Sequence, residues 1–374
     1  MDSVTQFVLG ASVGAAVLGP KYGLRKTALA GGVLGTLPDL DVFWDYGGAL
    51  ENFVRHRSAT HSIIVQTLIT PLLAEGLRKL LGGSEAARWP FYAAVWLILV
   101  THALLDATTI YGTQLLWPLT DYPFGLGSMF IIDPLYTLPL LVVTLWALIR
   151  PKWSSRFGKA VVTALTLSTA YLGWSILAQS WMEQEAKDQF AKRGIMPEQI
   201  LVIPLPLTTF AWKAIAIEST SYTNLYLPLV SSADEKLFYR HDRWPLELTC
   251  DALQNYPAHD ILQSFTKGFY SLSHLPGGSL MQADLRMGMT PDYVFRFELQ
   301  AQAREKFSSG HLARRVASTR TQEGDFEWLA NMTRGHITIR PAEAANLLPA
   351  KPKIQQQAKL SCKYTGDHSS AEVN

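Results

Sequence analysis

Residues 90–111 read PFYAAVWLILVTHALLDATTIY, an apolar run that contains one histidine, His102, and one aspartate, Asp106. As a helix, this run is long enough to cross a hydrocarbon core of about 30 Å. His102 and Asp106 are four positions apart, so a helix presents both on one face. Burying an ionisable side chain at bilayer depth costs at least ~2.5 to 3.5 kcal/mol, so such residues usually pair, bind ions or take part in chemistry. The run therefore predicts a membrane helix that carries a functional pair.

Two further motifs bring the same residue types to other apolar segments. Pro38-Asp39-Leu40-Asp41 ends one such segment, and His56-Arg57-Ser58-Ala59-Thr60-His61-Ser62 precedes or opens the next. Imidazole and carboxylate together suit zinc, manganese or iron. We therefore expect a divalent metal, zinc first and manganese or iron as alternatives. Its expected ligands, enough for one ion or for two, are Asp39, Asp41, His61, His102 and Asp106.

His56 and Arg57 are candidates for catalytic roles beside this site. His56 and His61 are five apart and cannot share a helical face, so we expect His56 in a loop, as a proton-transfer group or a further ligand. Arg57 is expected to hold a phosphate group, because guanidinium binds phosphate through two donors. Simpler explanations stay open: His102 as a hydrogen-bonded core residue, Arg57 as an interfacial anchor, and a turn at Asp39 and Asp41.

The composition divides the chain into two halves. Residues 1–182 hold 12 Lys and Arg, 10 Asp and Glu and 8 of the 11 Trp, whereas residues 183–374 hold 21 of each charge sign and 3 Trp. We therefore expect a membrane domain over 1–182, an extramembrane domain over 183–350 and a disordered polar tail over 351–374. A net charge of +2, evenly spread, argues against a nucleic-acid partner.

The expected fold class is an α-helical polytopic membrane domain followed by a mixed α/β domain. About six segments are apolar enough to be considered as spans: 4–20, 24–43, 59–81, 90–111, 129–149 and 160–182. Gly10 with Gly14, and Gly31 with Gly35, have the four-residue spacing that lets two helices approach closely. Asp133 followed by Pro134 is typical of a helix start, with Asp as the N-cap.

The positive-inside rule gives an expected orientation. Basic residues gather in the first, third and fifth connections: Lys21, Arg25, Lys26, Arg78, Lys79, Arg88, Arg150, Lys152, Arg156 and Lys159. The rule places these connections in the cytoplasm and both termini outside it. The first segment lacks a basic n-region and a small-residue cleavage site, so we expect a retained span. In a bacterium this predicts a multi-pass inner-membrane protein with periplasmic termini and a periplasmic second domain.

The second half predicts a covering domain with strands at 200–205, 210–218, 222–230, 293–300 and 335–339. Alternating residues in the second of these, such as Trp212 and Ala214, predict a sheet with one covered side. Cys250 and Cys362 could pair in an oxidising compartment. The histidines of this half lack ligand spacing and are predicted to be ordinary surface or turn residues: His241, His259, His274, His311, His336 and His368.

At these motifs the chain resembles the YdjM family of bacterial inner-membrane metal-dependent hydrolases. The matching stretches are the opening MDSVTQ, LPDLD, HRSATHS, THALLD with YGTQ after it, and IIDPLY. The resemblance extends to Thr266–Tyr270, Asp284–Gly288 and Tyr293–Phe297. It implies a membrane hydrolase in which the Asp and His motifs hold metal. Where other members have Thr-His, this chain has Thr5-Gln6, which removes one possible ligand.

The leading hypothesis is therefore a membrane-bound, metal-dependent hydrolase that cleaves a phosphoester or related bond of a lipid or other amphiphile. Its expected partners are membrane lipid and that substrate, and its oligomeric state stays open. A metal-ion or proton-coupled transporter is the first alternative, because His and Asp inside helices also build ion paths. A noncatalytic envelope stress protein with a structural metal is the second.

Overall fold

Contacts divide the computed structural model into two units. The first comprises Met1–Asp45, Arg55–Met182 and Ile203–Trp212, and the second comprises Tyr46–Val54, Glu183–Val202 and Lys213–Asn374. The structure describes residues 1–231, 235–245, 248–301, 312–319 and 321–349. The tail over 351–374, and the proposed pairing of Cys250 with Cys362, lie outside the described residues and side chains.

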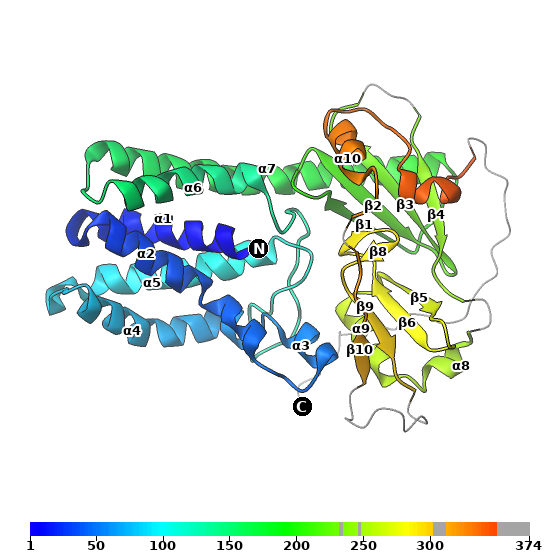
Figure 1. Cartoon of the computed structure of the whole chain (residues 1–374), viewed down its shortest axis with the longest axis horizontal. Helices are drawn as coiled ribbons and strands as arrows, with labels where there is room; N and C mark the ends of the chain where they lie inside the picture. Colours follow the sequence, from blue (N-terminus) through cyan, green and yellow to red (C-terminus); the bar gives the residue numbers. More distant parts are fainter. Residues whose placement is uncertain (232–234, 246–247, 302–311, 320, 350–374) are drawn as a thin grey trace, which may run out of the picture. The chain divides into compact units, whose positions relative to one another are not determined.

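The first unit is built from helices that lie side by side (Figure 1). The longer ones are α1 (Ser3–Tyr22), α2 (Leu24–Thr36), α4 (Ile63–Leu80), α5 (Arg88–Ala107), α6 (Pro134–Ile149) and α7 (Ser155–Lys192), whose last turns belong to the second unit. Short 3-10 helices lie between them: η1 (Pro38–Phe43), η2 (Ala59–His61) and η3 (Glu85–Ala87). Asp133 caps α6 by accepting from the backbone N–H groups of Leu135 and Tyr136, which confirms the predicted helix start.

Six membrane segments are not supported. Among the described residues, three helices are long and apolar enough to cross a membrane, Ser3–Tyr22, Arg88–Ala107 and Ser155–Lys192, and Pro134–Ile149 is apolar but shorter. The second expected segment is wrong because α2 stops after 13 residues, about 20 Å at 1.5 Å per residue. The third is wrong because α4 carries Glu75, Arg78 and Lys79 among its 18 residues.

Glycine allows α1 and α2 to pack in backbone contact. A Cβ atom at Gly14 would lie 2.5 Å from the carbonyl oxygen of Thr27, and one at Gly35 would lie 2.7 Å from that of Gln6. Gly10 and Gly31 face each other at the same crossing. The close approach predicted from the glycine spacing is therefore confirmed.

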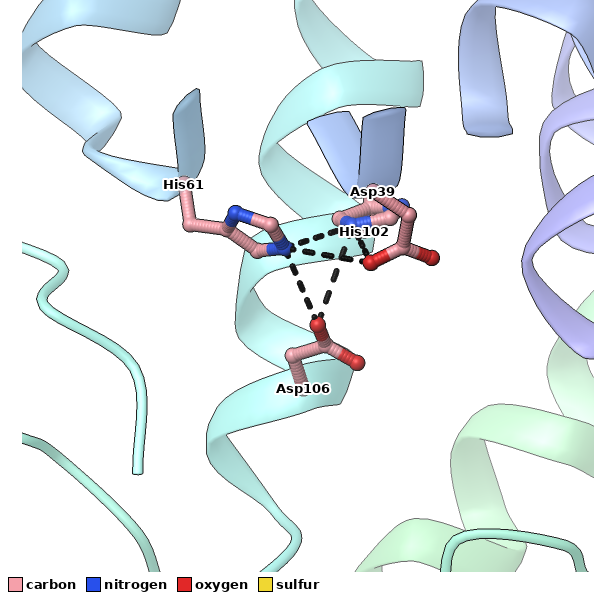
Figure 2. A group of neighbouring side chains, drawn as sticks. All are labelled: Asp39, His61, His102 and Asp106. Atoms are coloured by element: carbon pink, nitrogen blue, oxygen red, sulfur yellow. Dashed lines mark hydrogen bonds and ion pairs between the residues drawn. The ribbon is translucent and has the colours of Figure 1, made fainter. Parts of the chain in front are cut away.

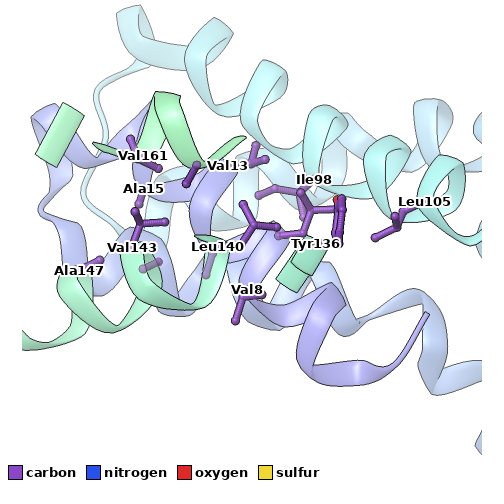
Figure 3. Close-up of a cluster of buried hydrophobic side chains, with 14 of the residues drawn as sticks. Val8, Val13, Ala15, Ile98, Leu105, Tyr136, Leu140, Val143, Ala147 and Val161 are labelled. Carbon is purple, nitrogen blue, oxygen red and sulfur yellow. The ribbon is translucent and has the colours of Figure 1, made fainter. Parts of the chain in front are cut away.

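An apolar cluster joins α1, α5, α6 and α7 (Figure 3). It includes Val8, Ala15, Ile98, Tyr136, Leu140 and Val161, all at most 3% exposed. In lipid, such helices associate through close packing, because the acyl chains are as apolar as the side chains. The cluster therefore holds α5, which carries His102 and Asp106, against α1.

The second unit contains antiparallel strands with short helices. One sheet has the order β1 (Gln199–Pro204), β2 (Ala211–Ile217), β3 (Ser221–Pro228), β4 (Phe238–Asp242). Another has the order β10 (Ala313–Arg315), β9 (Arg296–Leu299), β6 (Leu280–Asp284), β5 (Tyr270–His274), and β7 (Gly288–Met289) pairs with β8 (Asp292–Tyr293). The helices are α3 (Ala49–Arg55), whose last residue belongs to the first unit, α8 (Cys250–Leu253), α9 (Pro257–Phe265), α10 (Asp325–Thr333) and η4 (Pro341–Asn346).

Four of the five predicted strands overlap observed strands, and the fifth does not. Residues 335–339 follow α10 without a strand. The predicted one-sided sheet is also wrong, because every residue of β2 is buried. Lys213 is the charged member of that strand and is 1% exposed.

Glu343 of η4 is the centre of a buried polar network. Its carboxylate accepts from Asn224 Nδ2 at 2.8 Å, Tyr226 Oη at 2.5 Å and Arg340 Nη1 at 2.8 Å, and pairs with His241 Nε2 at 2.7 Å. Burial by itself raises the pKa of Glu343, but the bond with His241 and the charge of Arg340 lower it to about 2. His241 is thus a buried partner, contrary to the predicted surface role, and His259 is also buried.

Candidate metal centre

Two ligand candidates come from α5, as the spacing of the apolar run predicts. His102 and Asp106 project from the same side of the helix, one turn apart (Figure 2). They are 1% and 0% exposed. The helix ends at Ala107, just after Asp106, so the pair lies at its C-terminal end.

Asp39 and His61 reach the same point from two short 3-10 helices. Asp39 follows Pro38 in η1, and His61 is the last residue of η2. One ligand atom from each of Asp39, His61, His102 and Asp106 lies within 4.8 Å of the other three. These four residues, buried except for the partly exposed Asp39, could hold a metal ion.

The hydrogen bonds at Nδ1 fix both imidazole rings. His102 Nδ1 lies 2.6 Å from the carbonyl oxygen of Gly35, which can only accept, so His102 donates from Nδ1. Thr60 donates its hydroxyl proton to Asp41 Oδ2 at 2.9 Å, so its oxygen accepts from His61 Nδ1, also at 2.9 Å. With neutral rings, both Nε2 atoms therefore present lone pairs to the centre of the group.

Five of the six distances among the four atoms are close to those of a tetrahedral cation site, and all six are within 4.8 Å. His61 Nε2 lies 3.1 Å from His102 Nε2, 3.4 Å from Asp39 Oδ1 and 3.2 Å from Asp106 Oδ2. His102 Nε2 lies 3.6 Å from Asp39 Oδ1 and 3.7 Å from Asp106 Oδ2. In a regular tetrahedron with bonds of about 2.0 to 2.2 Å, ligand atoms lie about 3.3 to 3.6 Å apart. Two nitrogen and two oxygen donors at such distances suit zinc.

Asp41, a predicted ligand, is outside this group of four and supports it instead. Its Oδ1 bonds to His56 Nδ1 at 2.7 Å, and its Oδ2 accepts from the backbone N–H of Arg57 and from Thr60, both at 2.9 Å. Oδ2 is 3.8 Å from His61 Nδ1, on the side of the ring that faces away from the other donors. Asp41 thereby orients His61 through Thr60.

Arg57 and His56 lie next to the group. Arg57 Nε is 3.1 Å from Asp106 Oδ2, and the guanidinium carbon is 5.1 Å from the centre of the Tyr111 ring. The backbone of Arg57 has a φ of 65°, a left-handed conformation that is unfavourable for a residue other than glycine. Its N–H bond to Asp41 and its carbonyl bond to Gln114 hold it there. The His56 side chain is 23% exposed.

Four residues at the centre were not assigned to it from the sequence: Met1, Gln6, Gly35 and Thr60. Gln6 Nε2 donates to Asp106 Oδ1 at 3.0 Å, and the amino group of Met1 contacts the same oxygen. Thr60 lies inside the HRSATHS motif, so its position beside His61 was a usable signal. Gly35 acts through its carbonyl group, which no residue type reveals.

One comparison with known proteins gives a match. The model of the YdjM inner membrane protein family matches residues 1–182, which include all four residues of the candidate centre. The match does not extend to the stretches of the second half that resemble the family. Comparisons with curated proteins and with solved structures give no match.

Proposed function

Because residues 1–182 match the YdjM inner membrane protein family, we propose that this chain is a membrane-bound, metal-dependent hydrolase. We further propose that it cleaves a phosphoester or related bond of a lipid or amphiphile at the outer face of a bacterial inner membrane. Its termini and second unit are then periplasmic, as the distribution of basic residues favours.

The convergence of four donor atoms, two carboxylate oxygens and two imidazole nitrogens, is the observation that supports this proposal. Asp39, His61, His102 and Asp106 direct two carboxylate oxygens and two Nε2 lone pairs at one point. Such a set is stable when a cation lies among the donors, and their spacing suits one ion. Zinc is the first choice, and manganese or iron are alternatives. A bound divalent cation lowers the pKa of water and stabilises a developing oxyanion.

The neighbouring residues supply the rest of the proposed chemistry. Arg57, beside Asp106, binds an anionic oxygen of the substrate, as guanidinium groups do with phosphate. His56 exchanges protons with the medium, because its ring is partly exposed and bonded to Asp41. Asp41 and Thr60 keep His61 in the tautomer whose Nε2 faces the centre.

An amphiphilic substrate is favoured by the surface that adjoins Asp39. Asp39 is the least buried of the four residues, with its side chain 17% exposed. The apolar residues that follow it in η1 and directly after it are far more exposed: Leu40 52%, Val42 65%, Phe43 85% and Trp44 70%. A headgroup can therefore reach Asp39 while an acyl chain lies along these side chains.

The same four residues also support a second candidate function. Structural zinc sites are saturated by protein ligands, whereas catalytic sites keep one position open. Four side chains already converge here, so a noncatalytic protein with a structural metal is the competing proposal.

Metal content and turnover, measured together, test both proposals. The wild-type protein in detergent is expected to contain about one metal ion per chain and to hydrolyse bis-p-nitrophenyl phosphate or a fluorogenic phospholipid. His102→Ala and Asp39→Ala should lose both metal and activity, and His274→Ala, on β5 of the second unit, should keep both. Unchanged metal content in the His102→Ala and Asp39→Ala variants would show that these residues do not bind the metal. Metal without turnover of either substrate would favour the structural role.

A further inference from the structure

Gln6 is the one side chain of α1 that hydrogen-bonds to α5 at the candidate centre, among the described residues. It is 1% exposed, and its Nε2 donates to Asp106 Oδ1 at 3.0 Å and to the carbonyl oxygen of His102 at 3.3 Å. Both partners only accept, so the amide must present its NH2 group to them. Its Oε1 has no hydrogen-bond partner, so every hydrogen bond of this side chain goes to α5.

The two oxygens of Asp106 are consequently unequal. Oδ1 receives the Gln6 amide and the amino group of Met1. Oδ2 accepts no hydrogen bond; it lies 3.2 Å from His61 Nε2 and forms an ion pair with Arg57, whose Nε is 3.1 Å away. A carboxylate whose first oxygen is occupied by donors binds a cation through the second. We propose that Gln6 is a positioning residue that makes Asp106 a ligand through Oδ2 alone.

Helix packing fixes Gln6 for this role. The Gln6 carbonyl oxygen lies against Gly35, where a Cβ atom would approach it to 2.7 Å. The Gly35 carbonyl oxygen in turn accepts from His102 Nδ1. The Gln6 amide then spans one turn of α5, from the backbone of His102 to the side chain of Asp106. Gln6 and Gly35 therefore set the positions of both α5 ligands from one helix crossing.

The role rests on the metal centre of the proposed function and is independent of hydrolysis. It predicts that a side chain of similar size without N–H groups leaves only the Met1 amino group on Oδ1, so that Asp106 is held less firmly and can turn or bind through both oxygens. Gln6→Met keeps the length and removes both hydrogen bonds. Gln6→Asn keeps the amide but is one methylene too short to reach Asp106. Ser12→Ala is the matched control, because Ser12 is a buried polar residue of the same helix whose hydroxyl faces Thr144 at 3.5 Å.

The experiment measures zinc affinity of the full chain by chelator competition, with the visible absorption of the cobalt-loaded protein as a second readout. Both Gln6 variants should bind zinc ~10- to 100-fold more weakly than wild type, the range for a lost supporting partner. Their cobalt bands should differ from those of wild type, and Ser12→Ala should match wild type in both readouts.

Three results would count against the role. If both Gln6 variants bind zinc as tightly as Ser12→Ala, Gln6 does not position Asp106. An unchanged cobalt spectrum in both would lead to the same conclusion. A wild-type protein that binds neither ion would remove the metal centre itself, a failure of the proposed function that the variants do not produce.

Discussion

His61 Nε2 and His102 Nε2 lie 3.1 Å apart in the first unit, and neither ring can hold a proton between them without ionising or giving up its bond at Nδ1. Two lone pairs at this distance repel each other. A cation between them removes the repulsion, so the tautomers of both rings are part of the site. Groups that fix these tautomers should therefore control metal binding as strongly as some ligands do.

Thr60→Val tests the group that fixes the His61 tautomer. The substitution keeps the side-chain volume and removes the hydroxyl that links His61 Nδ1 to Asp41. We expect zinc affinity, measured by chelator competition, to fall ~10- to 100-fold. Thr163→Val on the exposed side of α7 is the control and should bind as wild type does. Equal affinities in the two variants would show that the hydroxyl does not orient the ring.

Gly35→Ala tests the contact between α1 and α2. The new Cβ atom would lie 2.7 Å from the Gln6 carbonyl oxygen and 3.1 Å from Gly10 Cα, so the helices must separate. We expect a loss of ~1 to 3 kcal/mol of stability, seen as a lower melting temperature in detergent. Metal affinity should fall as well, because the same residue accepts from His102.

Gly76→Ala provides the comparison for that substitution. Gly76 lies in α4, and a Cβ atom there meets nothing within 4 Å. Alanine at an open helical position should be neutral or stabilising by ~0.5 to 1 kcal/mol. If the Gly35→Ala and Gly76→Ala proteins have the same melting temperature, the packing described for α1 and α2 is contradicted.

Lys213 of β2 predicts a pH dependence of stability. Burial lowers the pKa of its ammonium from 10.5 to about 7, and the nearby charges of Glu343, Arg340 and Asp284 act on it as well. Between these two values the unfolded chain holds one proton more than the folded chain. The free energy of unfolding should therefore rise with pH across this window, by ~1.4 kcal/mol per pH unit. Below about pH 7 both states are protonated, and the folded protein bears the full cost.

Lys213→Met should remove the contribution of Lys213 to the pH dependence of stability. Its melting temperature should exceed that of wild type most at pH 6, and the difference should shrink steadily toward pH 10. Lys192→Met, at an exposed position of α7, is the control. Its melting temperature should differ from that of wild type by the same amount at every pH in this range. A difference that is the same at every pH would mean that Lys213 does not titrate in the window.

The proposed orientation is tested by labelling single cysteines in intact cells, after both native cysteines are replaced by serine. Leu119→Cys, at a position 81% exposed, should react with a membrane-impermeant maleimide added outside. Lys152→Cys, in the basic connection before α7, should react only after the cells are opened. Labelling of Lys152→Cys from outside would reverse the orientation.

The sequence predicted the α5 pair well because one helix carries both residues. The four-residue spacing of His102 and Asp106 depends only on helix geometry, and the surrounding residues are strongly apolar. Asp39 and His61 were also predicted at the centre. Their positions there depend on the short 3-10 helices that carry them, and the motifs do not predict these helices. Asp41 has the same chemistry as Asp39 and lies two residues away, so the sequence could not show that it orients His61 while Asp39 faces the centre.

The number of spans was less predictable because hydropathy alone does not show where helices stop. The segment expected over 24–43 becomes α2 followed by the 3-10 helix η1, with Pro38 at the start of η1. In the second unit, β4, β5 and β6 were missed because each is five residues long and bears polar residues. Over so few residues, the pattern of apolar and polar side chains does not distinguish a strand from a loop.

The place of Glu343 limits where the second unit can be cut for expression. η4 brings this carboxylate into contact with Asn224, Tyr226 and His241, all from strands more than one hundred residues earlier in the chain. A truncation before Pro341 would leave those polar groups buried without their acceptor, at roughly 1 to 3 kcal/mol for each. Soluble fragments should therefore extend past Asn346.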